Sequence, residues 1–189
     1  MSTKQQTLIS PQEYLALERE AEYKSEYYAG EVFALAGASL RHNLIAGNVL
    51  AELHSQLKGG DCQVYPSDLR VKVPQIPYYT YPDVTVVCGK PQLEDEHRDN
   101  LLNPIVVFEI LSRSSERHDR TSKFESYRRI ETLREYVLIA QDSYRIEHYR
   151  KQADGSWIFS ETIGADRTLK LPSIGCELKL SDIYAQVDF

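Results

Sequence analysis

The chain has 189 residues, is 42% hydrophobic and carries a formal net charge of -6. This length suits one globular domain over residues 1–189, and the acidic balance excludes nucleic-acid binding through a globally basic surface. No uncharged apolar run approaches the about 20 residues that a membrane span requires, and the polar N-terminus lacks the apolar region of a signal peptide. We therefore expect a cytoplasmic protein without a membrane partner.

The first sixty residues predict a helix, a hairpin and a second helix. Ser10 and Glu13 form the S-x-x-E capping box around Pro11, so a helix is expected to begin there and run to about residue 21. In residues 26–37, Ala-Gly separates two stretches of aromatic and β-branched residues, a pattern typical of a hairpin. Residues 39–58 carry apolar side chains at helical spacing and are followed by two glycines, which predicts a helix and its end.

The remainder of the chain is mainly extended. A polar, irregular stretch over 89–104 indicates a surface loop, and a helix is expected over about 117–133. Strands are expected at 62–66, 68–73, 84–88, 105–111 and 135–140, with a turn-rich segment at 74–83. Three further stretches, at 144–150, 156–163 and 168–172, predict a C-terminal antiparallel meander.

This order of elements predicts an α/β (α+β) fold with a mixed central sheet flanked by helices, an N-terminal hairpin and the C-terminal meander. The 105–111 strand is apolar throughout, so we expect it near the centre of the sheet. Cys62, Cys88 and Cys176 are odd in number and widely spaced, without a CxxC pair. They are interpreted as buried small side chains in a protein that needs no disulfide.

Asp83 and Glu109 are the candidate centre of a functional site. Asp83 begins one expected strand, and Glu109 lies inside an apolar strand, where an unpaired carboxylate would be costly to bury. One interpretation is structural, with an ion pair to Arg113 or Arg120. The other is a divalent cation shared with Asp83, because Mg²⁺ binds one or two carboxylates and leaves positions for water and a substrate phosphate. From spacing alone the structural interpretation is favoured.

The helix after Glu109 changes that balance. At about 100° per residue, Lys123 lies at the centre of the apolar arc, close to Tyr127 and Ile130. Asp119 and Arg120 lie on the same arc about one turn earlier. The alternative is an i,i+4 surface pair between Asp119 and Lys123, but the position of Lys123 on the apolar arc favours an inward lysine that reaches Glu109.

Residues 112–134 also offer a local basic surface for a nucleic acid. Seven basic side chains outnumber four acidic ones there. A solvated helix of mixed charge is the commoner outcome for such a run. The candidate nucleic-acid contacts are Arg113, Arg117 and Arg120.

The ordered series of motifs resembles a family of restriction-endonuclease-like proteins, abundant in cyanobacteria, within the PD-(D/E)XK nuclease superfamily. The resemblance rests on RHNLIAGNVLAEL, SDLRVKV, YPDVTVV, NPIVVFEILSRSS, RHDRTSKFESY, LREYVLIA, YRIEHYR and LPSIGCELKLSDIY. The superfamily pattern places a lysine two residues after Glu109, where this chain has Leu111. In the family that it resembles, the lysine is moved to the following helix, where Lys123 matches.

The resemblance implies the chemistry of a metal-dependent phosphodiesterase. Asp83, Glu109 and the backbone carbonyl of Ile110 would hold Mg²⁺ or Mn²⁺, and Lys123 would orient the attacking water or neutralise charge on the phosphate. Asp68 is either a further metal ligand or a turn residue. The residues that the resemblance or the helical arc places near the site are Glu26, His42, Asp119 and Tyr127. For His42, helix capping or core packing is at least an equal alternative, and Tyr127 is expected to pack, with a hydroxyl able to donate a hydrogen bond.

Three functions remain open at this stage. The first is a metal-dependent DNA endonuclease, expected as a homodimer because two equivalent sites cut both strands most simply. The second is a catalytically weak or inactive nucleic-acid-binding module of a mobile-element system. In the third, a structural protein, Asp83 and Glu109 are only satisfied core acids.

Overall fold

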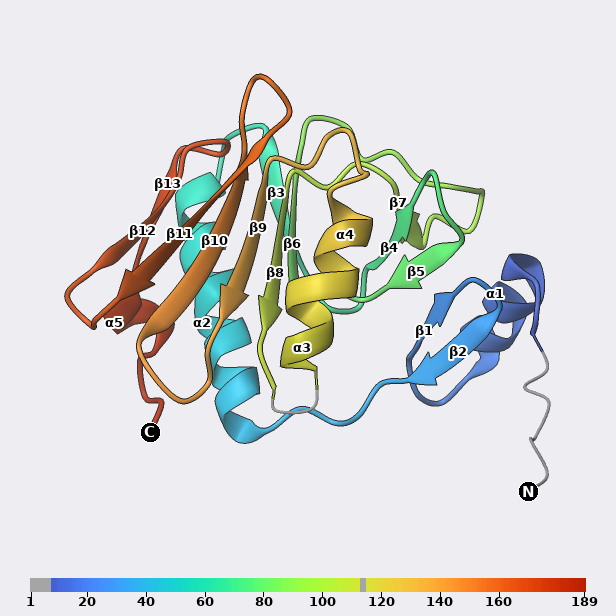
Figure 1. Ribbon diagram of the computed structural model, residues 1–189, viewed down its shortest axis with the longest axis horizontal. Coiled ribbons are helices and arrows are strands. Elements are labelled where there is room, and N and C mark those ends of the chain that lie inside the picture. Colours follow the sequence, from blue (N-terminus) through green and yellow to red (C-terminus); the bar gives the residue numbers. More distant parts are fainter. Residues whose placement is uncertain (1–7, 113–114) are drawn as a thin grey trace.

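The computed structural model describes residues 8–112 and 115–189. Two larger sheets, a two-stranded sheet, two longer helices and several short ones make up this part of the chain (Figure 1). The helices are α1 (Pro11–Glu20), α2 (Leu40–Leu57), α3 (Glu116–His118), the π-helical turn η1 (Asp119–Lys123), α4 (Phe124–Tyr127) and α5 (Leu180–Ile183). None of the described helices is long and apolar enough to cross a membrane.

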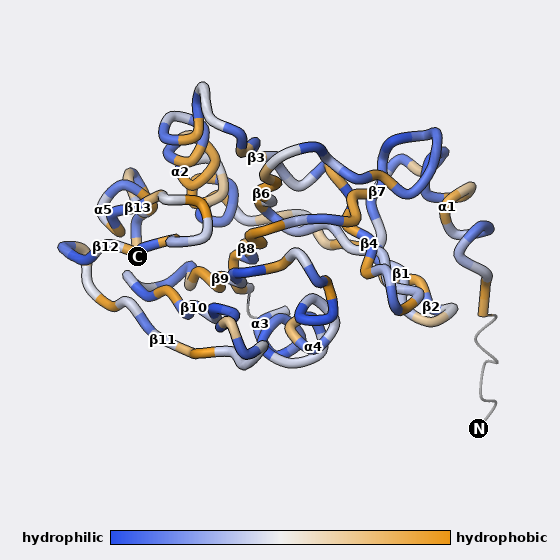
Figure 2. Tube along the Cα trace, turned by 90° about the horizontal axis from the view of Figure 1, so that it is seen from above, coloured by the Kyte–Doolittle hydropathy of each residue, from blue (hydrophilic) through white to orange (hydrophobic). Residues whose placement is uncertain are grey.

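The larger sheet has six strands in the order β11-β10-β9-β8-β6-β3. β8 and β9 are parallel, and the other neighbours are antiparallel, so the sheet is mixed as expected. The strands are β3 (Cys62–Pro66), β6 (Val84–Cys88), β8 (Val106–Ile110), β9 (Glu135–Ile139), β10 (Arg145–Lys151) and β11 (Trp157–Ile163). Viewed from above, the sheet lies between α2 on one face and α3 and α4 on the other (Figure 2).

The alternation of side chains along the larger sheet produces two cores. Even-numbered residues of β8, such as Phe108, face α2 and the C-terminal hairpin. Odd-numbered residues, such as Val107, face the second sheet and the helix after β8. Because side chains alternate between faces at every residue, Glu109 faces the second core together with Val107. β8 is buried along its whole length, which confirms the prediction from its apolar sequence.

The second sheet has five strands in the order β2-β1-β5-β4-β7. The hairpin and β4 were predicted from the sequence, but β5 lies in a stretch interpreted as a turn, and β7 lies inside the expected surface loop. β7 is only two residues long and pairs with β4, so its sequence carries no strand pattern of its own. The strands are β1 (Ser25–Tyr28), β2 (Glu31–Ala34), β4 (Arg70–Val73), β5 (Tyr78–Thr80) and β7 (Asn100–Leu101).

The helix expected over 117–133 is shorter and less regular in the structure. It begins at Glu116, widens into the π-helical turn η1 and ends with α4 at Tyr127. Ile130 and Leu133 continue the apolar spacing of a helix, but they reach the second core from consecutive turns. The spacing of these two apolar residues reflects their burial and not a helix, so the helix predicted from it was too long.

The C-terminal strands form a hairpin where a continuous meander was expected. β10 and β11 are antiparallel, but β12 (Thr168–Leu171) pairs with β13 (Cys176–Lys179) and not with β11. Glu135 of β9 links this hairpin to the larger sheet, because its carboxylate accepts a hydrogen bond from the Ser173 amide at 2.8 Å and contacts His148 Nε2 at 2.5 Å.

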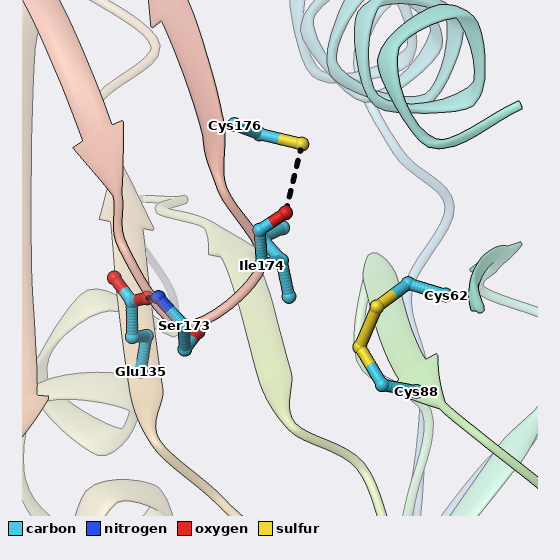
Figure 3. The surroundings of a disulfide bond; sticks show 6 residues. All are labelled: Cys62, Cys88, Glu135, Ser173, Ile174 and Cys176. Atoms are coloured by element: carbon cyan, nitrogen blue, oxygen red, sulfur yellow. Dashed lines mark hydrogen bonds between the residues drawn. A yellow bond between two sulfur atoms is a disulfide. The ribbon is translucent and has the colours of Figure 1, made fainter. Parts of the chain in front are cut away.

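The expectation of three unpaired cysteines was wrong for two of them. Cys62 and Cys88 form a disulfide between β3 and β6 (Figure 3). The two residues are direct register partners on antiparallel strands, a pairing that spacing along the chain does not reveal. Cys176 is free and buried, as expected.

An ionic cluster around Asp99 holds α1 against the second sheet. Asp99 accepts hydrogen bonds from Arg19 Nε at 2.8 Å and from the buried Arg70 at 2.6 Å. Hydrogen bonds from Arg19, together with the charge of Arg70, hold the pKa of Asp99 below its ordinary value of 3.8. Its contribution to stability is therefore complete above that ordinary value and is lost as the pH falls through the lowered pKa.

Replacing Asp99 with asparagine is expected to lower the free energy of unfolding by about 1.5–3 kcal/mol at neutral pH, the range for hydrogen bonds to charged groups. The deficit should shrink in acid, where the wild-type carboxylate is protonated as well. Urea unfolding at several pH values measures both effects. Asp68→Asn, at an exposed pair with Lys24, is the control and should change stability by less than about 1 kcal/mol. An equal loss in both variants would contradict the prediction.

Candidate active site

The register of β6 and β8 places the two candidate carboxylates side by side. Val84 pairs with Phe108, so one step further along the antiparallel ladder Asp83 comes opposite Glu109. Opposite residues on an antiparallel pair share a face, and both side chains therefore lie on the face of the second core. The predicted placement of the two acids on adjacent strands is confirmed.

Lys123 lies at the centre of a buried acidic cluster. Its Nζ is 3.1 Å from Glu109 Oε1, 3.1 Å from Glu26 Oε1 and 3.4 Å from Asp119 Oδ1. Glu26 comes from β1, Glu109 from β8 and Asp119 from η1, so one ammonium group joins the two sheets and the helix. The inward lysine predicted from the helical arc is confirmed, as is the proximity of Glu26 and Asp119.

The π-helical turn η1 explains why Asp119 and Lys123 both face inward. A π-helical turn bonds residue i to i+5 and holds more residues per turn than an α-helix does. Side chains four residues apart therefore lie nearly above one another. Asp119 and Lys123 bound η1, and Tyr127, four residues further on, is buried on the same side.

A hydrogen-bond network connects the acids behind Lys123. Tyr127 donates to Glu109 Oε1 at 2.9 Å, and Thr80 Oγ1 donates to Glu26 Oε1 at 2.6 Å. The Thr80 and Tyr127 hydroxyls are 3.2 Å apart, and Tyr78 lies within 3.4 Å of Glu26 Oε2. Tyr127 is thus both the packing residue that the sequence predicted and a hydrogen-bond donor to the site. This network fixes the orientations of Glu26 and Glu109.

Asp83 is held by two groups on its other side. Its Oδ2 accepts a hydrogen bond from the Ile110 amide at 2.7 Å and lies 3.1 Å from His42 Nε2. The helix cap is Ser39, whose Oγ accepts a hydrogen bond from the His42 amide at 3.1 Å, so the His42 side chain is not the cap and lies beside the site. Its Nδ1 is buried without a hydrogen-bond partner among the described residues.

Negative charge exceeds positive charge in this cluster. Lys123 contributes the single ammonium, which pairs with the carboxylates of Glu26, Glu109 and Asp119, and Asp83 adds a fourth carboxylate on the neighbouring strand end. Burial, more than any other cause, raises the pKa of Glu109 well above its usual value, and the neighbouring carboxylates add to this while Lys123 opposes it. Burial alone would lower the pKa of Lys123, but Glu109 and Glu26 outweigh it and hold that pKa well above its usual value. A cation bound here would relieve the excess charge.

The cluster opens into a cleft of about 1240 Å³. The cleft lies where the linker 35–39, the start of α2 and the ends of β8 and β9 meet. Its lining includes all the acids and bases of the cluster, namely Glu26, His42, Asp83, Glu109, Asp119 and Lys123. Glu109 is only 4% exposed and the Asp83 side chain 15%, so both carboxylates lie at the bottom of the cleft.

The donor set at the bottom of the cleft fits a hard divalent cation. No hydrogen bond from a described residue reaches Asp83 Oδ1 or Glu109 Oε2, which leaves one oxygen on each carboxylate. The described chain contains no group of three or more His, Cys, Asp and Glu side chains arranged around one metal position. Mg²⁺ does not require one, because it keeps several waters and binds through one or two carboxylates. The Ile110 carbonyl is a neutral oxygen on the same strand.

The structure does not bring every predicted residue to the cleft. Asp68 has an 86% exposed side chain and pairs with Lys24 at 2.7 Å, as a turn residue would. Arg120 lines the cleft, but its guanidinium bonds to Glu147 on β10 and to Glu116. Arg117 is exposed and outside the cleft lining, and Arg113 lies outside the described residues.

Sequence reasoning missed three polar residues of the site. Thr80 and Tyr78 lie in the segment interpreted as a turn, although the run YYT has the aromatic and β-branched composition of a strand. Gln141 follows β9 and joins two walls of the cleft. It accepts from Ser39 Oγ at 2.6 Å and donates to the Leu111 carbonyl at 2.8 Å. No signal in the sequence pointed to Gln141.

Comparisons with known proteins agree on the family. The Uma2 family, described as "Putative restriction endonuclease", matches residues 11–181. Two uncharacterized proteins of Synechocystis sp., sll1609 and slr1290, are each 35% identical to the chain. The matches cover 86% of this chain and 92% of sll1609, and 96% of this chain and 94% of slr1290.

A solved structure shares the fold. The crystal structure of a putative nuclease belonging to DUF820 from Anabaena variabilis superposes with a TM-score of 0.78 at 21% identity, covering 95% of this chain and 99% of that one. At this identity the likeness shows the fold alone, which is the restriction-endonuclease-like α+β arrangement expected from the sequence. The family match extends over α1 to the start of α5 and includes every residue of the acidic cluster. The chain therefore belongs to the Uma2 family of restriction-endonuclease-like proteins.

Proposed function

We propose that the protein is a metal-dependent DNA endonuclease that hydrolyses phosphodiester bonds in the cleft. The observation that carries this proposal is the convergence of Asp83, Glu109 and Lys123, from two strands and a helix, at the bottom of one cleft. Buried ion pairs in a protein core need only balanced charge. Here the acids exceed the bases, and each candidate ligand keeps one oxygen without a bond from a described residue.

Asp83, Glu109 and the Ile110 carbonyl would hold Mg²⁺ or Mn²⁺. Such an ion polarises a phosphate and lowers the pKa of a bound water. The Ile110 amide and His42 orient Asp83, while Tyr127 orients Glu109. These contacts preorganise the two carboxylates on strands, so little rearrangement is needed when a cation binds.

Lys123 would act on the phosphate or on the attacking water. Lys123 is only 6% exposed, and an ammonium shielded from water stabilises negative charge on phosphoryl oxygens more than it would in bulk solvent. Glu26 and Asp119 keep Lys123 charged and directed towards Glu109. Glu26 and Asp119 would thus fix the position of Lys123, and Asp83 and Glu109 would bind the metal.

The cytoplasmic location and the homodimer stay predictions, because no described contact bears on either. Size-exclusion chromatography with light scattering measures the oligomeric state directly.

Cleavage of supercoiled plasmid by the purified protein tests the proposed function. Nicking is expected with Mg²⁺ or Mn²⁺ and not with a chelator. Asp83→Asn should weaken the response to metal by about 10- to 100-fold, the range typical of damaged metal sites, and excess Mn²⁺ should restore part of the rate. The matched control is Asp68→Asn, which should cut as the wild type does. Binding of DNA without cleavage under every metal would favour the inactive binding module instead.

A further inference from the structure

The basic side chains that line the cleft differ in whether a carboxylate pairs with them. Lys123, Lys24, Arg120 and Arg145 each have at least one carboxylate partner. Arg41 is exposed in the first turn of α2, lines the cleft and forms no ion pair within residues 8–112 and 115–189. Arg41 is therefore the cleft-lining guanidinium available to a phosphate, a role that the sequence had assigned to Arg113, Arg117 and Arg120.

Exposed apolar side chains line the same cleft. Tyr23, between α1 and β1, is 70% exposed, and Leu40, at the start of α2, is 85% exposed. The Tyr23 ring has no stacking or hydrogen-bond partner among the described residues. Leu35, in the linker that runs between the hairpin and α2 (Figure 1), is exposed as well. Exposed apolar side chains that gather around one cleft are available for contact with a ligand.

Unpaired nucleotides match this composition better than duplex DNA does. In a duplex the faces of the bases are covered by their neighbours, so Tyr23 could reach only groove edges and phosphates. In a single strand each base has an accessible face, and stacking on an aromatic side chain is tolerant of sequence. A duplex also carries one charge per about 1.7 Å of axis, which a protein of net charge -6 repels.

The depth of the carboxylates supports the same choice. Asp83 and Glu109 lie at the bottom of the cleft, so a phosphate must enter it to reach them. A flexible single strand bends into such a cleft more readily than a stiff duplex does. We propose that the cleft takes an unpaired DNA strand, with a base stacked on Tyr23 and a backbone phosphate on Arg41.

This inference rests on the proposed function and specifies the form of its substrate. It also removes the reason for expecting a homodimer, because a site that acts on one unpaired strand needs no second site on the opposite strand.

Fluorescence anisotropy with a short labelled single strand and the matching duplex tests the inference. Protein carrying Glu109→Gln, with Mg²⁺ present, keeps the probes uncut. The single strand should bind at least about tenfold more tightly than the duplex. Adding Tyr23→Ala should weaken single-strand binding by about fivefold or more, the lower limit for loss of one base stack, while Tyr23→Phe should not.

A charge variant reports on the phosphate contact. Arg41→Ala should lower the slope of log affinity against log salt by about 0.7 for a single strand. The matched controls are Tyr28→Ala, an exposed tyrosine at the end of β1 and outside the cleft lining, and Arg129→Ala, an exposed arginine after α4. Neither control should change single-strand affinity or its salt dependence.

Two outcomes would overturn the inference: a duplex that binds as tightly as the single strand, or Tyr23→Ala and Arg41→Ala that behave as their controls do. Failure of the proposed function is a different observation. It would be the absence of metal-dependent cleavage by wild-type protein on plasmid, single strand and duplex alike, which the anisotropy experiment does not measure.

Discussion

Replacing Lys123 with methionine is expected to slow metal-dependent cleavage by about 10²- to 10³-fold, the usual cost of removing one preorganised electrostatic group from an active site. Lys123 is the one ammonium of the described cluster and pairs with three of its four carboxylates. Methionine has a similar length and fills the same space, so the change removes charge more than volume. Single-turnover cleavage at saturating metal measures the rate of the chemical step.

Arginine should not rescue the Lys123 variant, because its planar guanidinium cannot replace a compact ammonium inside a closed cluster. The control is Lys72→Met. Lys72 lies on β4 outside the cleft lining, and the change removes its ion pair with Glu94. It should affect stability without affecting the cleavage rate once the protein is folded. Urea unfolding of each variant separates loss of fold from loss of chemistry. A Lys123→Met protein that is folded and cuts at the wild-type rate would remove Lys123 from the mechanism.

The heart of this site was predictable because two short-range patterns determine it. Two apolar runs placed Asp83 and Glu109 on strands, and one helical arc turned Lys123 inward; that the two acids lie opposite each other depends on the register of β6 and β8. Both patterns depend only on spacing within an element and on burial of its apolar neighbours. The π-helical turn did not disturb the prediction, since it keeps Asp119 and Lys123 on the same buried side.

The contacts that the sequence did not determine are those between distant segments. Glu26 was placed near the site by resemblance, yet its bond to Lys123 depends on how the second sheet packs against the larger one. The Cys62–Cys88 disulfide and the β7 strand follow from strand register, which no local pattern encodes. Arg120 lies in a basic run that suggested a phosphate contact, but its guanidinium bonds to Glu147, 27 residues later on β10.

Exposure was the property that sequence reasoning judged least well. The sequence does not distinguish an arginine without an ion pair from one that has a carboxylate partner. The candidate contacts were therefore taken from the basic run at 112–134, and Arg41 was missed. The mixture of polar and apolar side chains around the cleft forms only when the linker, α2 and the turn before β1 come together in the fold. Substrate form is therefore decided by tertiary structure even where the catalytic groups are decided by local sequence.

Wild type and the Glu109→Gln variant should exchange their order of stability when metal is added. Without metal, the variant is expected to unfold at a higher urea concentration than the wild type, because folding raises the pKa of Glu109 and so disfavours its charged form at neutral pH. Each unit of such a rise corresponds to about 1.4 kcal/mol. Glutamine keeps an oxygen that accepts hydrogen bonds from Lys123 and Tyr127, and Lys123 keeps Glu26 and Asp119 as partners.

With metal the wild type should become the more stable protein, since a ligand that binds only the folded state adds about 2.7 kcal/mol at a concentration 100 times its Kd. The variant, with one carboxylate ligand fewer, should gain much less. Urea unfolding with a chelator and with increasing Mn²⁺ measures both curves. The control, Glu147→Gln, lies on β10 outside the cleft and breaks the pair with Arg120; it should lose stability without metal and keep the full Mn²⁺ response. If Mn²⁺ stabilises wild type and Glu109→Gln equally, Glu109 is not a ligand, and its burial has a purely structural cause.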